Sequence, residues 1–402
     1  MLENIRQDFP ILNQEVNNKP LVYLDSAASA QKPQCVIDSM QHYYQYDNAN
    51  VHRGAHTLGD RATQGFESAR DTVKTFLNAA SRQQIIWTKG TTEAINLIAN
   101  GLAGSLQSGD EIIVSTMEHH ANIVPWQMLA ERTGASLKVL TINEQGELSH
   151  AQFVDLITAR TKVLAMTHVS NVLGTINPVK DFIATANAHN IISVIDGAQA
   201  VPHFSVDVQD LDCDFYVFSS HKLFGPTGLG VLYGKTERLE AMPPYQGGGE
   251  MIERVSFSGT TYNQLPYKFE AGTPPICEAI GLKSAIEYLN TLDKSNVAEH
   301  EQSLLKRAEE LASKIPGMRI IGTASHKVPV MSFLIEGLHP SDIGTLLDQQ
   351  GIGIRTGHHC AMPLMEHLSI PGTARASFAF YNTMDEVESL FAALAKIQRL
   401  FV

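Results

Sequence analysis

The chain has only four cysteines in 402 residues, Cys35, Cys213, Cys277 and Cys360, and it contains no CxxC pair. Cysteines so widely spaced argue against a disulfide framework and favour a reducing compartment. No apolar run approaches the roughly 18 residues that a membrane span needs. The first ten residues include acidic side chains and no apolar core, so a secretory signal is not expected. These absences predict a cytoplasmic protein without a membrane segment.

Positive charge is also scarce. Lys and Arg number 30 against 42 Asp and Glu, which gives a formal net charge of −12, and no basic run interrupts this balance. Such a protein repels nucleic-acid phosphates and anionic lipid surfaces, so neither is an expected partner. Hydrophobic residues make up 44% of the chain, which is enough for a large domain with a sizeable core and a smaller second domain.

Short apolar runs alternate with helical stretches over the first part of the chain. Strands are expected at 85–88, 111–115, 137–140, 163–168, 191–196 and 215–219. Helices are expected between them, at 91–103, 122–132, 151–158 and 179–189. Strands that are apolar throughout and separated by helices predict an α/β fold with a mainly parallel sheet, covered on both faces. Sheets of this kind bind ligands at the carboxyl ends of their strands.

The pattern changes after the glycine-rich stretch 247–249. A long helix at 275–292 leads out of the first domain. Beyond it, helices are expected at 296–313, 341–350 and 385–400 and strands at 330–335, 352–356 and 373–380. The predicted organisation is an N-terminal segment (1–20) that packs with the small domain, a large domain (21–292) and a small α+β domain (293–402).

Polar side chains follow three of the predicted strands. Asp196 ends an apolar strand, where burial penalises its charge unless a cation lies nearby. Lys222 follows the strand at 215–219, and Gly90-Thr91-Thr92 opens a helix whose N-terminal amides suit a phosphate. A lysine for a Schiff base, an aspartate for a pyridinium nitrogen and a phosphate cradle are what pyridoxal 5'-phosphate (PLP) requires.

Each of these features has a plainer explanation when taken alone. An aspartate after a strand is commonly a helix N-cap, a lone lysine is commonly solvated, and a threonine before a helix commonly caps it. All three at strand ends, in the order that a PLP site needs, indicate PLP binding.

Longer motifs carry a resemblance over nearly the whole chain. They are Tyr23-Leu24-Asp25-Ser26-Ala27-Ala28, Asn50-Val51-His52-Arg53-Gly54, Glu118-His119-His120-Ala121-Asn122, Asp196-Gly197-Ala198-Gln199, Ser219-Ser220-His221-Lys222 and Arg355-Thr356-Gly357-His358-His359-Cys360. With them the chain resembles the class V aminotransferase-like branch of the fold-type I PLP-dependent transferases. More closely, it resembles the SUF-type (group II) cysteine desulfurases, which include selenocysteine lyases. The short segment before Cys360 fits group II, because group I carries a longer loop there.

The resemblance implies roles around the cofactor. Lys222 would hold PLP as a Schiff base, Asp196 would pair with the pyridine nitrogen, and Gln199 would bond the ring hydroxyl. His119 would stack on the ring as a neutral imidazole and transfer a proton, since an imidazole titrates near neutral pH. The phosphate would be bound by Thr91, Thr92, Ser219 and His221.

Further roles follow from the same resemblance. Thr273, in Ala271-Gly272-Thr273, would reach the phosphate in a partner subunit, which implies a homodimer with shared sites. Asn171 and Arg375 would hold the substrate carboxylate, with Arg375 as a bidentate clamp. Without the resemblance, a surface ion pair would be the plainer reading of Arg375. No metal is expected, because the adjacent histidines of the Glu118 motif have poor ligand spacing.

Cys360 separates sulfur transfer from other PLP chemistry, because a thiolate is needed to attack the substrate sulfur. A free cysteine is usually a small buried hydrophobe, which is the expectation for the other three. A protonated His358 or His359 beside Cys360 would favour its thiolate.

The predicted function is therefore a cysteine desulfurase. It would convert L-cysteine to L-alanine and pass the sulfur through a Cys360 persulfide to a SUF-type acceptor protein, and by analogy to iron–sulfur cluster assembly. Selenocysteine lyase, cysteine sulfinate desulfinase and aminotransferase activities are alternatives on the same scaffold. A non-catalytic sulfur-relay or scaffold protein is a further alternative, although it would need none of the proposed site residues.

Overall fold

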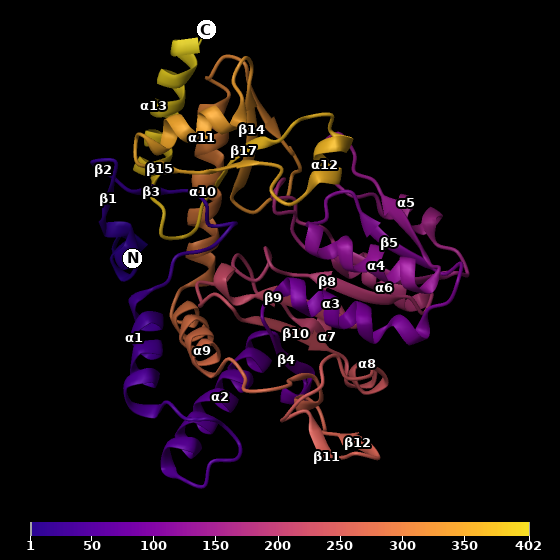
Figure 1. The fold of residues 1–402 in the computed structure, drawn as a ribbon. Coiled ribbons are helices and arrows are strands. Elements are labelled where there is room, and N and C mark those ends of the chain that lie inside the picture. Colours follow the sequence, from indigo (N-terminus) through magenta and orange to yellow (C-terminus); the bar gives the residue numbers. More distant parts are fainter. Residues whose placement is uncertain (1, 402) are drawn as a thin grey trace.

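A seven-stranded sheet forms the centre of the computed structural model, which describes residues 2–401 (Figure 1). Met1 and Val402, the outermost residues of the predicted N-terminal segment and small domain, lie outside the described residues. The strands, in their order across the sheet, are β4 (Ile85–Thr88), β10 (Gly230–Gly234), β9 (Phe215–Ser219), β8 (Ile192–Asp196), β7 (Thr161–Thr167), β5 (Glu111–Ser115) and β6 (Ser136–Leu140).

The sheet is mainly parallel, as predicted, with one reversed strand. The pairs from β9 through to β6 are all parallel, whereas β10 runs antiparallel to both β4 and β9. The sequence analysis did not predict β10. The connection from β9 to β10 is too short for a parallel crossover, so the chain returns antiparallel.

Helices cover both faces of this sheet (Figure 1). They are α2 (Thr57–Phe76), α3 (Thr91–Gly101), α4 (Val124–Thr133), α5 (His150–Leu156), α6 (Val179–Ala188), α7 (Val208–Leu211), α8 (Thr236–Ala241) and α9 (Ile276–Asn290), and α1 (Gln34–His42) packs on α9. Successive side chains of β7 point to opposite faces of the sheet, and each face has its own helix layer. Leu164 and Met166 pack in a core with α2, α6 and α9, whereas Val163 and Ala165 pack in a core with α3 and α4.

The C-terminal part forms a second, four-stranded antiparallel sheet. Its strands are β13 (Met318–Ile321), β14 (Val330–Ile335), β17 (Thr373–Ser377) and β16 (Arg355–Gly357). Its helices are α10 (Lys294–Ala312), α11 (Pro340–Asp348), α12 (Met362–His367) and α13 (Met384–Phe401). Buried side chains of α10, α11 and α13 make a separate core against this sheet. The layout agrees with the predicted fold class of a large α/β part followed by a smaller α+β part.

The N-terminal residues contact this smaller part. A short hairpin, β1 (Glu15–Val16) with β2 (Lys19–Pro20), precedes β3 (Val22–Tyr23), which pairs in parallel with β15 (Ile352–Gly353). Arg6 forms an ion pair of 2.7 Å with Glu386. The single strand predicted at 352–356 is in fact two strands, because β15 joins β3 whereas β16 joins the four-stranded sheet.

A hairpin of β11 (Ile252–Ser256) and β12 (Gly259–Tyr262) projects from the edge of the large part (Figure 1). Its apolar side chains Val255, Phe257 and Tyr262 are exposed. Among residues 2–401, no helix is both long enough and apolar enough to cross a membrane.

Candidate active site

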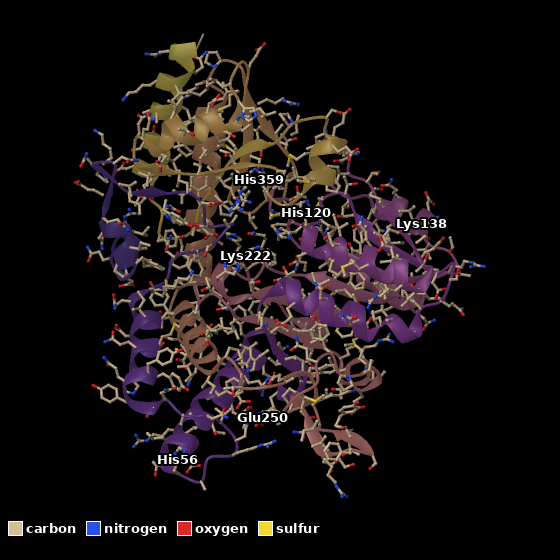
Figure 2. The ribbon with its side chains drawn as sticks, viewed as in Figure 1. His56, His120, Lys138, Lys222, Glu250 and His359 are labelled. Atoms are coloured by element: carbon tan, nitrogen blue, oxygen red, sulfur yellow. The ribbon has the colours of Figure 1, made fainter. Side chains whose placement is uncertain are left out.

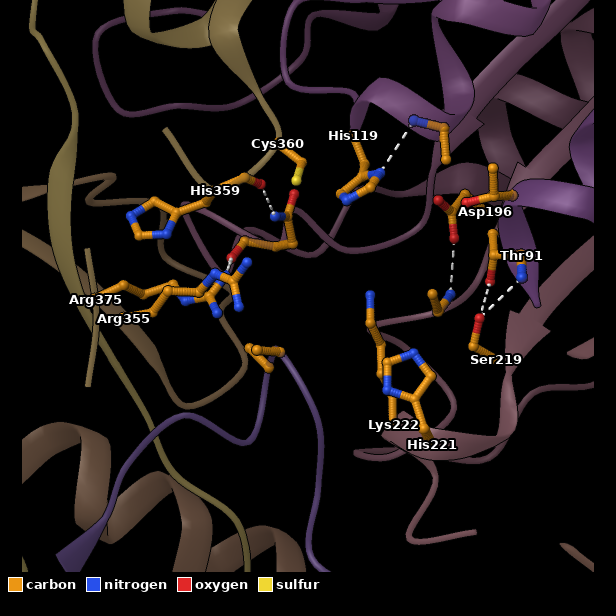
Figure 3. Close-up of a pocket in the computed structure, with 16 residues that line it drawn as sticks. Thr91, His119, Asp196, Ser219, His221, Lys222, Arg355, His359, Cys360 and Arg375 are labelled. Atoms are coloured by element: carbon orange, nitrogen blue, oxygen red, sulfur yellow. Dashed lines mark hydrogen bonds between the residues drawn. The ribbon is translucent and has the colours of Figure 1, made fainter. Parts of the chain in front are cut away.

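A cavity of about 170 Å³ lies between the carboxyl ends of the central strands and the small sheet (Figure 3). The predicted site residues that line it are Thr91, Thr92, His119, Asn171, Asp196, Ser219, His221, Lys222, Cys360 and Arg375. Residues that are far apart in the sequence thus share one cavity. In Figure 3, Cys360 and His119 enter it on the side opposite Lys222.

Adjacent parallel strands bring Lys222 and Asp196 together. Asp196 ends β8, and Lys222 lies in the 3₁₀ turn that follows β9. Burial lowers the pKa of Lys222, although Asp196 opposes this change, and burial raises the pKa of Asp196 despite the lysine. Within the described residues, Lys222 forms no hydrogen bond or ion pair, so its amine is available to an aldehyde, and the lowered pKa favours the neutral form. A protonated pyridine nitrogen would supply the additional cation that the Asp196 carboxylate lacks.

The start of α3 fits a phosphate. Gly90, its N-cap residue, offers no side chain to the first-turn amides, and the Thr91 amide donates to Ser219 Oγ at 2.9 Å. The hydroxyls of Thr91 and Ser219 lie 2.8 Å apart. A Cβ at Gly230 would lie 2.4 Å from Gly90 Cα. Only a glycine at position 230 therefore allows β10 to lie so close to the turn at Gly90 that precedes α3. The lysine, the aspartate and this cradle together fit PLP.

His119 is held as a neutral ring. Its Nδ1 accepts a hydrogen bond of 3.0 Å from the Ala121 amide, which leaves the proton of the neutral imidazole on Nε2. Burial, with a contribution from Lys222, lowers the pKa of His119 to about 3. The neutral form expected for stacking is therefore supported. The expectation that this imidazole titrates near neutral pH is wrong, because burial disfavours the charged ring.

Cys360 lies half-buried in the turn between β16 and α12. Burial, followed by the charge of Arg375, lowers the pKa of the neighbouring His359 to about 3. His359 is thus neutral, and the expectation that it favours the thiolate as a cation is wrong. Of the other cysteines, Cys213 and Cys277 are buried as predicted, whereas Cys35 is exposed.

Arg375 and Asn171, the predicted substrate pair, are in contact. Arg375 on β17 donates to the Asn171 carbonyl at 2.8 Å and to Asp25 Oδ1 at 3.0 Å. Its Nε is buried and has no partner among the described residues. Asn171 in turn donates to the His359 carbonyl at 2.8 Å, so the two predicted residues lie beside the Cys360 turn.

Two predicted site residues do not line the cavity. The Gln199 side-chain nitrogen donates to the Ala27 carbonyl at 2.6 Å, behind the cavity wall. Thr273 lines a different surface pocket, beside Lys89 and Tyr245. Their predicted contacts, with the ring hydroxyl and with a partner subunit's phosphate, stay predictions.

The sequence analysis assigned no role to Arg355, which also lines the cavity. Arg355 on β16 lies directly opposite Arg375 in the ladder, and it reaches Asp25 Oδ2 at 3.9 Å. Like charges at opposed positions are unfavourable unless an anion compensates them. Arg355 opens the Cys360 motif, and a basic residue there was the available signal for a second anion-binding group.

The aminotransferase class-V family model matches residues 22–390, nearly the whole chain. The chain belongs to the class-V aminotransferase family. PLP is the cofactor of this family, which confirms the predicted cofactor.

Relatives of the chain are similar to it over nearly all of its length. The chain is 53% identical over 401 residues to the cysteine desulfurase of Serratia proteamaculans, covering 99% of this chain and 98% of the relative. It is 49% identical to the cysteine desulfurase of Synechococcus elongatus, where the match covers 99% of this chain and 64% of the relative. The chain therefore spans less than two thirds of the Synechococcus protein.

A solved structure agrees with the fold. The crystal structure of the cysteine desulfurase CsdA from Escherichia coli, in an S-sulfonic acid form, superposes with a TM-score of 0.93 at 43% identity and covers 100% of this chain and 99% of that one. These comparisons confirm the predicted fold-type I transferase fold and the predicted resemblance to cysteine desulfurases.

Proposed function

We propose that the chain is a PLP-dependent cysteine desulfurase, which converts L-cysteine to L-alanine and takes the sulfur on Cys360. The observation that carries this proposal is the placement of Cys360 across one cavity from Lys222 and Asp196 (Figure 3). PLP bound there supplies an electron sink that weakens the bonds of a bound amino acid. Relatives at about half identity are named for the same activity.

The two arginines bind the substrate carboxylate in this proposal. Arg375 is rigid, because it is buried and bonded to the Asn171 carbonyl and to Asp25. Arg355 faces it across the ladder, and Asp25 balances only one of the two positive charges, so the substrate carboxylate provides the second anion. Asn171 orients the same end of the substrate and thereby directs its thiol toward Cys360.

Lys222 holds the cofactor aldehyde and, as a neutral amine, moves the proton at the substrate Cα. Asp196 would balance the protonated ring nitrogen, and Gln199 would contact the ring hydroxyl only by turning from the Ala27 carbonyl toward the cavity. Thr91, Thr92, Ser219 and His221 hold the phosphate. His119 packs on the ring and presents its Nε2–H to the cavity, where it donates a hydrogen bond to the departing group.

The sulfur step balances without a further reagent. Cys360 forms an S–S bond to the substrate sulfur as the substrate C–S bond breaks, so L-cysteine and the Cys360 thiol give L-alanine and a Cys360 persulfide. The persulfide sulfur then passes to an acceptor protein of the SUF type, and from there to iron–sulfur cluster assembly. The half-buried position of Cys360 supports a partner that reaches into the turn.

The proposal includes a homodimer in the cytoplasm. Thr273 lines a surface pocket outside the cavity, which fits a residue that serves a partner subunit. The exposed apolar side chains of the β11–β12 hairpin support burial against a second copy. The division into an N-terminal segment (1–20), a large domain (21–292) and a small domain (293–402) is supported by the separate cores and by the Arg6–Glu386 contact.

The test is release of alanine and sulfide from L-cysteine with a reductant, together with the visible spectrum of the protein. Equimolar products from a yellow protein are expected. Cys360→Ala should abolish both products and keep the PLP absorption, and it should retain release of selenium from L-selenocysteine, because selenium leaves more readily than sulfur. Full turnover of L-cysteine by Cys360→Ala would exclude Cys360 as the sulfur acceptor.

A further inference from the structure

The turn that carries Cys360 has little regular structure to hold it. It spans the residues between β16 and α12, and both His359 and Cys360 have positive φ angles, 51° and 57°. A non-glycine residue in this left-handed region costs roughly 1 kcal/mol. The turn therefore depends on side-chain contacts to keep its conformation, and with it the direction of the Cys360 thiol.

Two histidines outside the proposed catalytic set make these contacts. The His120 amide donates to the Cys360 carbonyl at 2.7 Å, and the Met362 amide donates to His120 Nε2 at 3.0 Å. The Cys360 amide donates to His358 Nδ1 at 3.1 Å. Hydrogen bonds thus secure Cys360 itself on both sides of its Cα, and two of the three bonds end on an imidazole lone pair. Figure 2 places His120 where the large part meets the small one.

These bonds require both rings to be neutral. A ring nitrogen that accepts from a backbone amide carries no proton, so His120 is protonated on Nδ1 and His358 on Nε2. A second proton on His120 would turn its acceptor nitrogen into a donor that faces the Met362 amide. The two ring centroids lie only 5.6 Å apart, so a charge on one ring also opposes a charge on the other.

The surroundings of the turn oppose a positive charge on His120. Burial and the proximity of His358 both lower its pKa. Neither ring forms an ion pair with a carboxylate within residues 2–401. The titratable and charged groups of the segments around the turn and the cavity are Asp25, Glu118, His119, Asp196, His221, Lys222, Arg355, His359, Glu366, His367 and Arg375. Of the carboxylates among them, Asp25 is paired with Arg375, Glu118 is fully buried among its own hydrogen bonds, and Asp196 accepts from the Ala198 amide on the large-sheet side of the cavity.

We propose that His120 and His358 are positioning residues for Cys360, which hold its turn at the cavity as neutral rings and release it when His120 is protonated. The inference rests on the proposed function, since it concerns the thiol that accepts the sulfur. Above the His120 pKa the thiol is directed at the substrate. Below that pKa the Met362 bond is lost and the turn opens toward solvent.

The test measures access to the thiol rather than turnover. Iodoacetamide alkylation of Cys360 in the holoenzyme is followed by peptide mass spectrometry from pH 5.5 to 8.5, relative to alkylation of the exposed Cys35 in the same sample. His120→Phe keeps a ring without the acceptor. His120→Gln keeps an acceptor near the Nε2 position and cannot be protonated. His189→Gln, at an exposed histidine remote from the turn, is the matched control.

At pH 8, we expect His120→Phe to raise the Cys360-to-Cys35 alkylation ratio about 3- to 10-fold, the effect of losing one such hydrogen bond. His120→Gln and His189→Gln should match the wild type there. As the pH falls to 5.5, the ratio should rise in the wild type and in His189→Gln but stay low in His120→Gln. Identical profiles for the wild type and His120→Gln would overturn the proposal even if His120→Phe failed to fold. Loss of desulfurase activity alone would not affect this readout.

Discussion

The large-sheet wall of the cavity is formed by Thr91, Asp196, Ser219 and Lys222. Asp196 and Ser219 end strands that are hydrogen-bonded to a neighbour on each side, Lys222 follows one of these strands, and Thr91 opens a helix. On the small-domain wall, Arg355 and Cys360 belong to an edge strand and a left-handed turn, and only Arg375 lies inside a sheet. The first wall is fixed by backbone ladders, which favours holding a cofactor in one place. The second depends on contacts between side chains and backbone, which favours substrate entry and sulfur delivery.

The largest effect should come from Lys222→Ala, which removes the proposed covalent anchor from the large-sheet wall. We expect turnover of L-cysteine to fall by about 10³-fold or more, because the same amine binds the aldehyde and moves the Cα proton. Alanine release measures the loss. Borohydride reduction should attach the cofactor mass to the wild type and to the surface control Lys162→Ala, but not to Lys222→Ala. Covalent attachment in Lys222→Ala would assign the anchor to another lysine.

The small-domain wall can be divided by comparing Arg375→Lys with Arg355→Lys. Arg375 is buried and bonded in two directions, whereas the Arg355 side chain is partly exposed. Loss of a bidentate carboxylate contact should reduce kcat/KM for L-cysteine by about 10- to 100-fold in Arg375→Lys, mostly through KM. The effect in Arg355→Lys should be several times smaller. The visible spectrum of both variants should stay that of the wild type, and a loss of PLP absorption would assign the arginines to the cofactor instead.

The rigidity of the large-sheet wall predicts a high cost for one added methyl group. A Cβ at Gly197, directly after Asp196, would lie 2.0 Å from Cε1 of the buried Tyr216 ring. Gly197→Ala should therefore destabilise the holoenzyme by about 1–3 kcal/mol, the usual cost of overpacking. Gly104→Ala, where a Cβ meets nothing within 4 Å, is the matched control and should melt like the wild type. Equal melting of both variants would show that this wall yields more easily than its packing indicates.

The same two walls differ in how far the sequence alone predicted them. Apolar strands such as 85–88 and 215–219 were predicted with their exact bounds, because a buried strand is apolar throughout. Their ends then indicated Asp196 and Lys222 by chemistry alone. Arg375 was assigned only through the family resemblance, since its contact with Asn171 spans 204 positions. The bonds of His120 to the Cys360 turn, the reversal of β10 and the role of Arg355 depend on tertiary pairing, which local sequence patterns do not contain.

The smallest predicted effect concerns acid stability on the small-domain wall. His359 Nε2 lies 2.8 Å from Thr373 Oγ1, while its buried Nδ1 has no partner among the described residues. A second proton would place an unpaired charge there, which is why burial lowers the pKa of His359 to about 3. The unfolded chain binds that proton near pH 6.5 and the folded chain does not, so His359 costs stability as the pH falls below 6.5. His359→Gln retains a donor toward Thr373 and cannot titrate, so the fall in Tm between pH 7 and pH 5 should shrink by roughly 2 °C. His119→Gln tests the opposite wall in the same way, since the pKa of His119 is also lowered to about 3. In the proposed function PLP covers His119, so the contribution of His119 should be larger in the holoenzyme than after the cofactor is removed. A His359→Gln melting curve with the full wild-type pH dependence would mean that the small-domain wall opens and hydrates its histidine before the protein unfolds.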